Sequence, residues 1–422
     1  MKKIITLAMF IAVIFTSYSQ SLGYQDLGVL FSRNDQNGTA RFSAMAGSFG
    51  AIGGDISSIN INPAGLAVFK DSEFTGSLNS RNTTIGANYY ETLINSQNFH
   101  ASIPQIGAVF VFDMYDKPEW SKVVIGFNYR VQKDFDNQFL ARGNNGFTTF
   151  NSYPLDQNET PIQYNIANEQ LFDTTFRGKI SEMSFGLSAI HQEKLYVGIA
   201  LNTYDLQFTQ TANLYEYNND EQGNTLDASL YQENITAGSG ISLSTGFIYK
   251  ILPNFRFGLS YQTPTWFSEV VEETNITEND GYFGDAEISV SNDTELMYAN
   301  TAENYFPTQS YLYQMRTPGK FTASSAIIFG KSGLINIDYT RKNYRNIRLS
   351  NADFSTENQY FQNSLRNTAA LNIGTEWRFG NASVRGGYQF EQSPYDIQEV
   401  NDLKKYSFGG GYHFGKFKID FF

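Results

Sequence analysis

The residue types that carry most enzyme chemistry are scarce in this chain. It has three histidines and no cysteine among 422 residues, which excludes thiolate metal sites, iron–sulfur clusters and disulfides. His100 precedes Ser102 by two positions, and a histidine base beside a serine nucleophile is a hydrolase arrangement. His191 falls in an expected turn and His413 in an expected strand, and no H-E-x-x-H spacing occurs. We predict no catalytic residue, no cofactor site and no metal site, and we place His100 in an exposed loop.

The composition is polar overall but rich in aromatic rings. The net charge is -12, which argues against a nucleic-acid partner because phosphate binding needs clustered Lys and Arg, so no such partner is expected. Aromatic residues make up 16% of a chain with a mean hydropathy of -0.35. Residues 1–19 read as a signal peptide, because Lys2 and Lys3 precede an apolar run from Ile4 to Phe15. No later run is long enough to form a membrane-spanning helix.

Segments of about ten residues that alternate apolar with polar or small side chains recur along the chain. In Val123 to Val131, for example, every second residue from Val123 is apolar, and Asn128 and Arg130 occupy the other face. Further segments of this kind begin near Glu73, Ile103, Met183, Leu195, Ile241, Phe255, Phe321, Leu334, Ala369, Val384, Tyr406 and Phe417. The pattern therefore predicts about thirteen strands.

The connections between these strands are short and long in alternation. Tight connections include Gly330 to Gly333 and Gly380 to Asn381. Long polar ones lie near Gln132 to Lys179, Thr209 to Ser239, Pro264 to Gly319 and Arg341 to Arg366. Bacterial outer-membrane barrels have short periplasmic turns, long external loops and an even number of strands. We predict an all-β fold: a transmembrane antiparallel β-barrel of about 14 strands. The odd visible count means that the last strand is either missing or unrecognised in the pattern.

The two faces of the predicted strands differ in chemistry. A polar lumen is expected to contain Asn128, Arg130, Asn336, Asp338, Asn372, Glu376, Arg378, Arg385 and Gln389. Aromatic residues near the strand ends suit the two membrane interfaces, namely Tyr129, Tyr249, Tyr261, Tyr339, Trp377, Tyr388 and Tyr412.

The segment before the first strand has no alternation and consists largely of small residues between Gly38 and Ala67. Its runs Gly47-Ser-Phe-Gly-Ala-Ile-Gly-Gly-Asp55 and Asn60-Ile-Asn-Pro-Ala-Gly65 resemble the N-terminal plug of the FadL-like outer-membrane transporters. Asn62-Pro63-Ala64 is similar to that family's Asn-Pro-Ala signature. Tyr261-Gln-Thr-Pro264 and Thr317-Pro-Gly-Lys-Phe321 resemble its Bacteroidetes-type members.

The resemblance implies three parts: a signal peptide at 1–19, a plug or hatch within the lumen at 20–72, and the barrel at 73–422. It also implies passive uptake of fatty acids or aromatic hydrocarbons in the outer membrane of a Gram-negative bacterium, with a plug-gated lateral exit and no enzymatic activity. The plug and gating residues would be Asp55, Asn62, Pro63, Ala64 and Gly65, with Asn62 hydrogen-bonded to the strand at 123–131. The candidates for the ligand path are Leu22, Leu27, Leu30, Phe31, Arg130, Phe306, Tyr311 and Tyr313.

Other interpretations remain open at this stage. His100-Ala-Ser102 is similar to the His-x-Ser of outer-membrane phospholipases, but Ile103 and Pro104 follow where that family has Asn-Gly. The acidic stretch Pro264 to Pro318 contains ten Asp or Glu and could bind Ca²⁺, although it lacks EF-hand spacing. Basic residues at Arg341, Lys342, Arg345 and Arg348 could contact lipopolysaccharide phosphates, attract a fatty carboxylate or balance the acidic loops.

We expect a monomer whose partners are a hydrophobic small molecule, outer-membrane lipid and lipopolysaccharide. The alternative function is a barrel that serves as a protein-interaction partner in type IX-like secretion of surface proteins.

Overall fold

The computed structural model describes residues 22–114, 119–149, 152–153, 162–279, 309–397 and 400–422. The helical elements are α1 (Tyr24–Ser32), α2 (Ala40–Ala44), η1 (Ile56–Asn60), η2 (Pro63–Val68), η3 (Tyr344–Asn346) and α3 (Ser355–Ser364). The first strands are β1 (Glu73–Tyr89), β2 (Thr92–Asp113), β3 (Trp120–Asp134), β4 (Asn137–Gly143), β5 (Ser152–Tyr153), β6 (Ile162–Gln163), β7 (Ile166–His191), β8 (Leu195–Asn219) and β9 (Thr225–Leu252). The remaining strands are β10 (Phe255–Gln262), β11 (Trp266–Asn279), β12 (Gln309–Arg316), β13 (Lys320–Phe329), β14 (Gly333–Asn343), β15 (Arg348–Ser350), β16 (Asn367–Phe379), β17 (Ala382–Glu391), β18 (Leu403–Phe414) and β19 (Phe417–Phe421).

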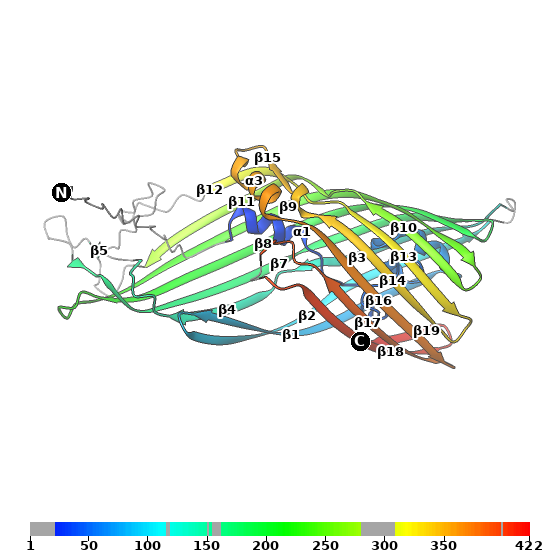
Figure 1. Cartoon of the computed structure of the whole chain (residues 1–422), viewed down its shortest axis with the longest axis horizontal. Coiled ribbons are helices and arrows are strands. Elements are labelled where there is room, and N and C mark those ends of the chain that lie inside the picture. Colours follow the sequence, from blue (N-terminus) through cyan, green and yellow to red (C-terminus); the bar gives the residue numbers. More distant parts are fainter. Residues whose placement is uncertain (1–21, 115–118, 150–151, 154–161, 280–308, 398–399) are drawn as a thin grey trace, which may run out of the picture.

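Seventeen of these strands form one antiparallel sheet that curls into a long barrel (Figure 1). In four places two successive strands share one position in the wall, separated by a short break. These pairs are β3 and β4 along β7, β10 and β11 along β9, β12 and β13, and β14 and β15. The described strands therefore occupy thirteen positions, as the alternation predicts. Within the described ranges no backbone ladder joins β19 to β1, but Lys418 Nζ lies 2.8 Å from a carboxylate oxygen of Glu73.

The wall is apolar outside and polar inside, which confirms the predicted fold class. Exposed side chains include Phe127, Leu187, Ile199, Leu243 and Phe321. Burying such groups in a hydrocarbon phase is favourable, whereas an aqueous surface rarely carries so continuous an apolar band. The expected lumen residues that are buried comprise Asn128, Arg130, Asn336, Asp338, Glu376, Arg385 and Gln389. None of the helices in the described part of the chain is both long enough and apolar enough to cross a membrane.

Several segments expected to be long loops are instead strands. The connection predicted at 209–239 consists mostly of the ends of β8 and β9, which pair from Leu195↔Tyr249 to Asn219↔Thr225 without a register shift. Likewise, β7 begins at Ile166, inside the loop expected at 132–179. The inward face of these strand ends mixes apolar residues such as Ala212 and Leu214 with polar ones such as Glu216 and Asn218, so their hydrophobic alternation is weak. Backbone pairing extends the barrel well beyond the apolar band.

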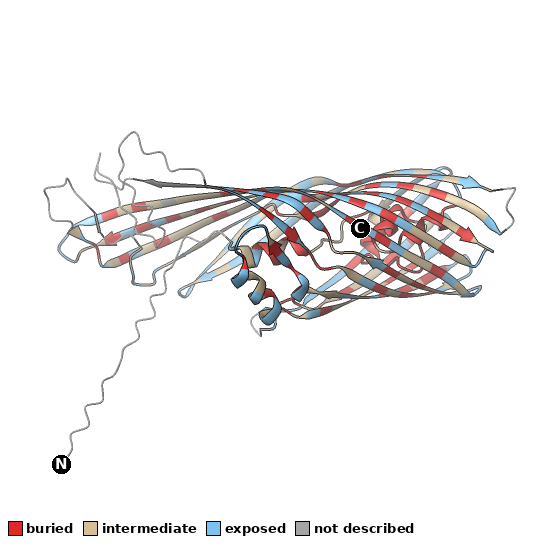
Figure 2. Cartoon of the chain, turned by 90° about the horizontal axis from the view of Figure 1, so that it is seen from above, coloured by how far each residue is buried: buried red, intermediate tan, exposed pale blue. Residues whose placement is uncertain are grey.

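Most residues from 22 to 69 are buried, and the short helices of this segment lie within the barrel, where Figure 2 shows a group of largely buried helical turns. Helix α2 contacts β17, β18 and β19, η1 contacts β2, β3 and β7, and η2 contacts β7, β8 and β9. These contacts come from opposite parts of the strand order, so the segment fills the cross-section of the barrel. Residues 1–21, which include the expected signal peptide, lie outside the described residues.

Candidate functional site: the plug, an apolar cluster and a gap in the wall

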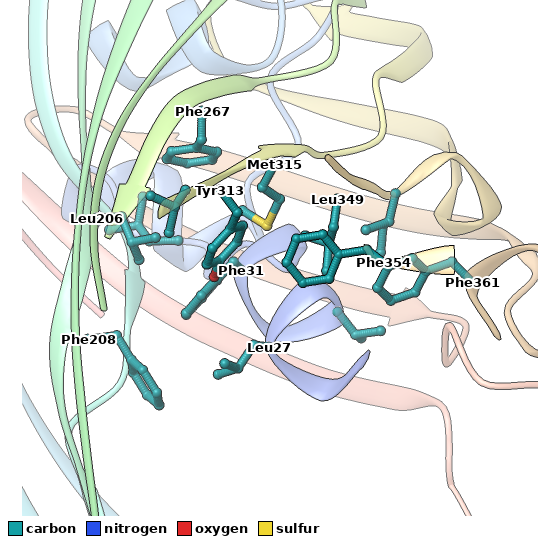
Figure 3. Packing of buried hydrophobic residues seen from close by; sticks show 14 of the residues in the cluster. Leu27, Phe31, Leu206, Phe208, Phe267, Tyr313, Met315, Leu349, Phe354 and Phe361 are labelled. Carbon is teal, nitrogen blue, oxygen red and sulfur yellow. The ribbon is translucent and has the colours of Figure 1, made fainter. Parts of the chain in front are cut away.

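Helix α1 forms the centre of an apolar cluster inside the barrel (Figure 3). Phe31 contacts two rings edge-on, with centroid distances of 5.7 Å to Phe135 and 5.5 Å to Phe208. Such edge-to-face pairs add to the stabilisation from burial itself. Gly28 lets helix α3 approach closely, because a Cβ there would lie 2.7 Å from the Phe361 ring. The helix therefore occupies the apolar interior in the way that a hydrophobic ligand would.

The expected ligand-path residues divide into three groups. Leu27, Phe31 and Tyr313 belong to the buried cluster, and Leu22 and Leu30 pack against it while partly buried. The other two described candidates lie apart: Tyr311 is half exposed near the end of β12, and Arg130 lies in a polar layer next to the plug. Phe306 lies outside the described residues.

The rim of the cluster contains a buried polar pair. Tyr24 packs against Tyr313 at a centroid distance of 5.6 Å and faces Glu272. Burial and the nearby Glu272 carboxylate raise the pKa of Tyr24 well above its usual range. Burial likewise raises the pKa of Glu272, in the part of β11 that lies beyond the apolar band. The rim therefore favours neutral groups, consistent with a path for apolar molecules.

A polar layer separates the cluster from the plug. Arg130 Nε donates to a carboxylate oxygen of Glu182 at 2.6 Å, and the Tyr204 hydroxyl donates to the same carboxylate at 3.1 Å. Beside this pair lies a cavity of about 110 Å³ lined by Arg130, Lys320 and Lys342 together with Asp35 and Glu391. The two lysines donate to main-chain carbonyls, Lys320 to Asn60 at 3.0 Å and Lys342 to Ser32. The cavity lining is therefore of mixed charge, with three cationic groups and two carboxylates.

The Asn62-Pro63-Ala64 triplet fixes the plug backbone and attaches it to the wall. Asn62 Nδ2 donates to the carbonyls of Gly50 at 2.8 Å and Phe247 at 3.0 Å, and its Oδ1 accepts from Ala64 N at 3.1 Å. Pro63 opens η2, where the missing N–H costs no hydrogen bond. The expectation that Asn62 bonds the strand at 123–131 is wrong, because Phe247 belongs to β9.

Asn60 makes the contact that was expected of Asn62. Its Oδ1 accepts from Asn128 Nδ2 of β3 at 2.9 Å, and its Nδ2 donates to Ser184 Oγ of β7 at 2.9 Å. The two asparagines lie on either side of a tight turn and point to different strands. Local sequence does not show which one faces which strand.

Glycines in the wall allow the plug to touch the strands. A Cβ on Gly198 would lie 2.4 Å from Ala64 N, and one on Gly246 would lie 2.4 Å from Asn62 Oδ1. No side chain fits at such distances, so Gly198 and Gly246 leave the space in the wall that the Asn62-Pro63-Ala64 triplet occupies. The other two plug candidates are internal: Asp55 caps η1 by accepting from Ser57 N at 3.0 Å, and the Gly65 carbonyl accepts from Gly54 N at 3.0 Å.

Charged side chains hold the opposite side of the plug. Arg41 Nε donates to Glu376 at 2.6 Å, and Arg385 Nε donates to the same carboxylate at 2.8 Å. The Asp338 carboxylate accepts from the backbone N–H of Phe49 at 2.8 Å. A buried carboxylate that loses such partners is strongly destabilising. These bonds make the body of the plug, from 40 to 69, a firmly attached unit.

The hydrogen-bond ladder of the wall is interrupted between β2 and its neighbour. β2 pairs with β3 from Asp113↔Lys122 to Gln105↔Arg130, and within the described ranges no backbone pair joins residues 92–104 of β2 to β3 or β4. Side chains cross this gap instead: Asn98 Nδ2 donates to Gln138 O at 2.7 Å, and Ser96 Oγ accepts from Leu140 N at 3.0 Å. The exposed Phe99 and Ile103 lie on β2 along the same edge.

The wall is also kinked where β3 ends and β4 begins, at the level of the gap. Val131 and Gln132 are both buried, so the alternation of β3 fails there, and β3 and β4 are separated by two residues. One of these, Phe135, turns inward to join the apolar cluster and donates its N–H to Gly178 O at 3.0 Å. Gly178 has a φ of +101°, a conformation that favours glycine.

The segment between α1 and α2 bonds to the kinked strand from inside. Asp35 N donates to Gln132 O at 2.8 Å, and the Asp35 carboxylate accepts from Asp134 N at 3.0 Å. Lys133 Nζ lies 2.8 Å from the same carboxylate. The N-terminal segment therefore satisfies backbone groups of β3 at the level where β2 no longer pairs with it.

A polar cluster closes the gap from the side of β1 and β2. His100 Nε2 lies 3.2 Å from an oxygen of Asp134, and His100 Nδ1 lies 3.1 Å from an oxygen of Asp136. Arg81 adds a guanidinium 3.4 Å from Asp134. In the described part of the chain, this is the group whose ligand atoms lie close enough to hold a metal ion, within 4.8 Å of one another. The two ring nitrogens of His100 face different carboxylates, and the Arg81 guanidinium lies beside Asp134, so the cluster joins β1 and β2 to the kink by polar side-chain contacts.

Comparison with known proteins supports this architecture. No protein-family model and no curated protein sequence matches the chain. The CymD monoaromatic hydrocarbon channel aligns with 91% of this chain and 90% of its own, at 13% identity and a TM-score of 0.52. A FadL homologue from Pseudomonas aeruginosa aligns with 92% and 89%, at 13% and 0.53. A deltaS2S3 mutant of the TodX monoaromatic hydrocarbon channel aligns with 92% of each, at 16% and 0.53.

The chain has the fold of the FadL-like channels. This FadL-like wall also has an apolar hollow of about 680 Å³ on its outer face, beside Gly198 and Gly246. The hollow is a second place to consider for an opening of the wall. The strands there, β8 and β9, pair without interruption, and the seated Asn62 lies directly behind them. The hollow is therefore a feature of the outer face. Within the described ranges, ladder pairs to β3 and β4 are missing along residues 92–104 of β2, and ladder pairs are also missing between β19 and β1.

Sequence reasoning missed the residues that form the gap. His100 was placed in a loop, whereas it lies within β2 and pairs with two aspartates. Asp35, Phe135 and Asp136 were not singled out. A signal did exist, since Phe135 stands between two aspartates immediately after an alternating strand. Its meaning depends on partners far along the chain, which no local pattern reveals.

Proposed function

We propose that this protein is a monomeric outer-membrane channel of a Gram-negative bacterium for passive uptake of hydrophobic small molecules. Three features support the proposal: the apolar outer band, the polar interior and the likeness to hydrocarbon channels. Among the residues that the structure describes, the interior offers binding surfaces and no arrangement of nucleophile and base. His100, the residue closest to such a role in sequence, is paired with Asp134 and Asp136. The protein therefore moves its ligand without changing it.

The ligand follows the apolar cluster and then the polar layer. A hydrocarbon chain or ring replaces the contacts of Leu27 and Phe31 in the cluster, since pockets for small molecules are lined mainly by apolar rings. The cavity of mixed charge in the polar layer offers the amino groups of Lys320 and Lys342 to one carboxylate. A fatty acid matches both regions, whereas an aromatic hydrocarbon matches only the cluster. We therefore assign fatty acids as the preferred class.

The ligand leaves sideways at the gap beside β2. The observation that carries this proposal is the double attachment of the N-terminal segment, which contributes Phe31 to the cluster and Asp35 to the kinked strand. A ligand that displaces α1 from the cluster also removes the inner support of β3. The side-chain bridges of Ser96 and Asn98 can then separate without breaking any β2 ladder.

A disulfide across the gap tests this exit. The bond from Leu140 N to Ser96 Oγ limits the separation of the two Cα atoms to about 7 Å, near the upper end of what a disulfide spans. The chain has no cysteine, so S96C/L140C introduces the only pair. We expect uptake of a labelled long-chain fatty acid by outer-membrane vesicles to fall to the level of vesicles without the protein when the pair is oxidised. Reduction should restore it.

The matched control places a disulfide at an intact seam one strand away. Thr84 and Gln97 are opposite each other in the β1–β2 ladder, so oxidised T84C/Q97C should leave uptake unchanged. Full uptake through oxidised S96C/L140C would refute the lateral exit at β2. Loss of uptake in both oxidised variants would show that any cross-link in the wall blocks uptake, and the lateral exit at β2 would then have no support from this experiment.

The ligand class has its own test. Small molecules are extracted from protein purified in mild detergent and identified by mass spectrometry, with an unrelated barrel as control. Enrichment of fatty acids supports the assigned class, and enrichment of neutral hydrocarbons overturns it. A co-purifying protein without any enriched small molecule would instead favour a role as an interaction partner in secretion.

A further inference from the structure

Four arginines gather on the outer surface of two adjacent strand positions. Arg316 ends β12, Arg341 lies near the end of β14, Arg345 lies in η3, and Arg348 begins β15; all four are exposed. Arg316 and Arg348 are directly opposite each other in the β12–β15 ladder. Like charges at directly opposite positions destabilise a sheet. We call these four residues the arginine patch.

No carboxylate of the described residues lies within ion-pair distance of the arginine patch. Other cations in the upper part of the barrel do have such partners, for example Arg366 with Asp402 at 3.3 Å and Lys133 with Asp35 at 2.8 Å. Within the patch, Arg341 donates to the Tyr339 hydroxyl at 3.1 Å, and Arg345 donates to Leu365 O at 2.7 Å. A concentration of uncompensated positive charge in a chain with a net charge of -12 points to an external anion.

The position of the patch identifies the level at which that anion lies. Trp266 is directly opposite Arg316 across the β11–β12 ladder, and Phe321 is directly opposite Arg341 across the β13–β14 ladder. Both rings are exposed, at 43% each, as is that of Tyr339 at 41%. Aromatic rings of this kind mark the boundary between hydrocarbon and headgroups. The guanidinium groups therefore begin where the headgroups of the outer leaflet lie.

From this geometry we infer that the arginine patch binds the phosphate groups of the outer-leaflet glycolipid. The inference rests on the outer-membrane location in the proposed function but not on the ligand path. Guanidinium forks match phosphate oxygens bidentately, and one phosphate between Arg316 and Arg348 cancels their repulsion. The neighbouring rings of Trp266 and Phe321 then contact the first acyl groups of the same lipid.

The test measures lipid retention by two charge-matched variants. R316Q/R348Q removes two positive charges from the patch, and K331Q/K416Q removes two exposed charges from the short turns at the other end of the barrel. Each protein is purified in mild detergent and titrated with bisphosphorylated lipid A, with the same glycolipid lacking phosphate, and with phosphatidylglycerol. Native mass spectrometry counts the bound lipid, and heat-modified gel mobility checks that each barrel is folded.

We expect the natural protein and K331Q/K416Q to bind bisphosphorylated lipid A about tenfold more tightly than R316Q/R348Q, because each lost arginine removes charge-assisted hydrogen bonds. Phosphate-free glycolipid should bind all three proteins equally weakly. Equal retention by both variants would overturn the inference. Equal affinity of the natural protein for phosphatidylglycerol would overturn the assignment to the glycolipid. Uptake through the gap is measured separately, so failure of the channel proposal is distinguishable from failure of this one.

Discussion

Replacing Asp35 by alanine should free the kinked strand from the N-terminal segment. The carboxylate accepts one backbone hydrogen bond, from Asp134 N at 3.0 Å, and forms one ion pair, with Lys133 Nζ at 2.8 Å. The side chains of the pair are 19% and 28% exposed, so water screens the ion pair and limits it to at most about 1 kcal/mol. The hydrogen bond to a charged acceptor contributes about 1.5 kcal/mol. The attached state therefore loses about 2 kcal/mol, or roughly 30-fold in its population relative to the detached state.

Hydrogen exchange and uptake measured together test this reasoning. Amides at 131–134 should exchange up to about 30-fold faster in D35A, because local opening becomes more frequent by that factor. Fatty-acid uptake should rise at low ligand concentration, since less ligand is needed to detach the segment. The control D113A removes an exposed acidic residue at the opposite end of the barrel that pairs only through the backbone with Lys122. Faster exchange without any change in uptake would show that the attachment is structural and does not gate the channel.

Two further predictions concern the plug and its rim. G198V should unseat the plug and increase leakage of small hydrophilic solutes, because a Cβ there would lie 2.4 Å from Ala64 N; G76V, with open space around its Cβ, should leave conductance in planar bilayers unchanged. E272Q should raise the thermal midpoint in detergent at about pH 8 but not at about pH 4, because burial raises the pKa of Glu272 and thus disfavours its charged form in the folded state. That cost is present above the folded-state pKa and disappears as protonation proceeds below it, so an equal gain at both pH values would contradict the assignment.

The barrel and its plug could be predicted from the sequence, because each produces a local pattern of residue types. Lipid on one side and a lumen on the other impose period two, as in Val123 to Tyr129, and the packing of a plug into a narrow space requires small residues. The strand extensions above the apolar band are not readable. At the ends of β8 and β9 the inward face mixes apolar with polar residues, so the alternation is weak, and the mutual pairing of the two strands identifies them.

The site was predictable in its parts but not in its arrangement. The apolar residues Leu27 and Phe31 of the N-terminal segment were recognised by type, and the structure places them in one cluster. The partner of Asn62 was not recognisable, since its bond to Phe247 O spans 185 positions. The gap depends on the absence of pairing along 92–104 of β2, and nothing in the composition of β2 distinguishes that stretch from a fully paired strand.

Three contacts meet at the kink between β3 and β4. Two of them come from the N-terminal segment and one comes from β2. Phe135 contacts Phe31 in the cluster, Asp35 holds the adjacent backbone at Asp134, and His100 reaches the aspartates from β2. The first two both belong to one N-terminal segment, so a single displacement of α1 loosens them together. The third contact lies within the wall, where His100 of β2 contacts Asp134 and Asp136. Under the proposed lateral exit, a ligand that displaces α1 would remove the contacts of Phe31 and Asp35 together, and occupancy of the cluster would thereby be coupled to release.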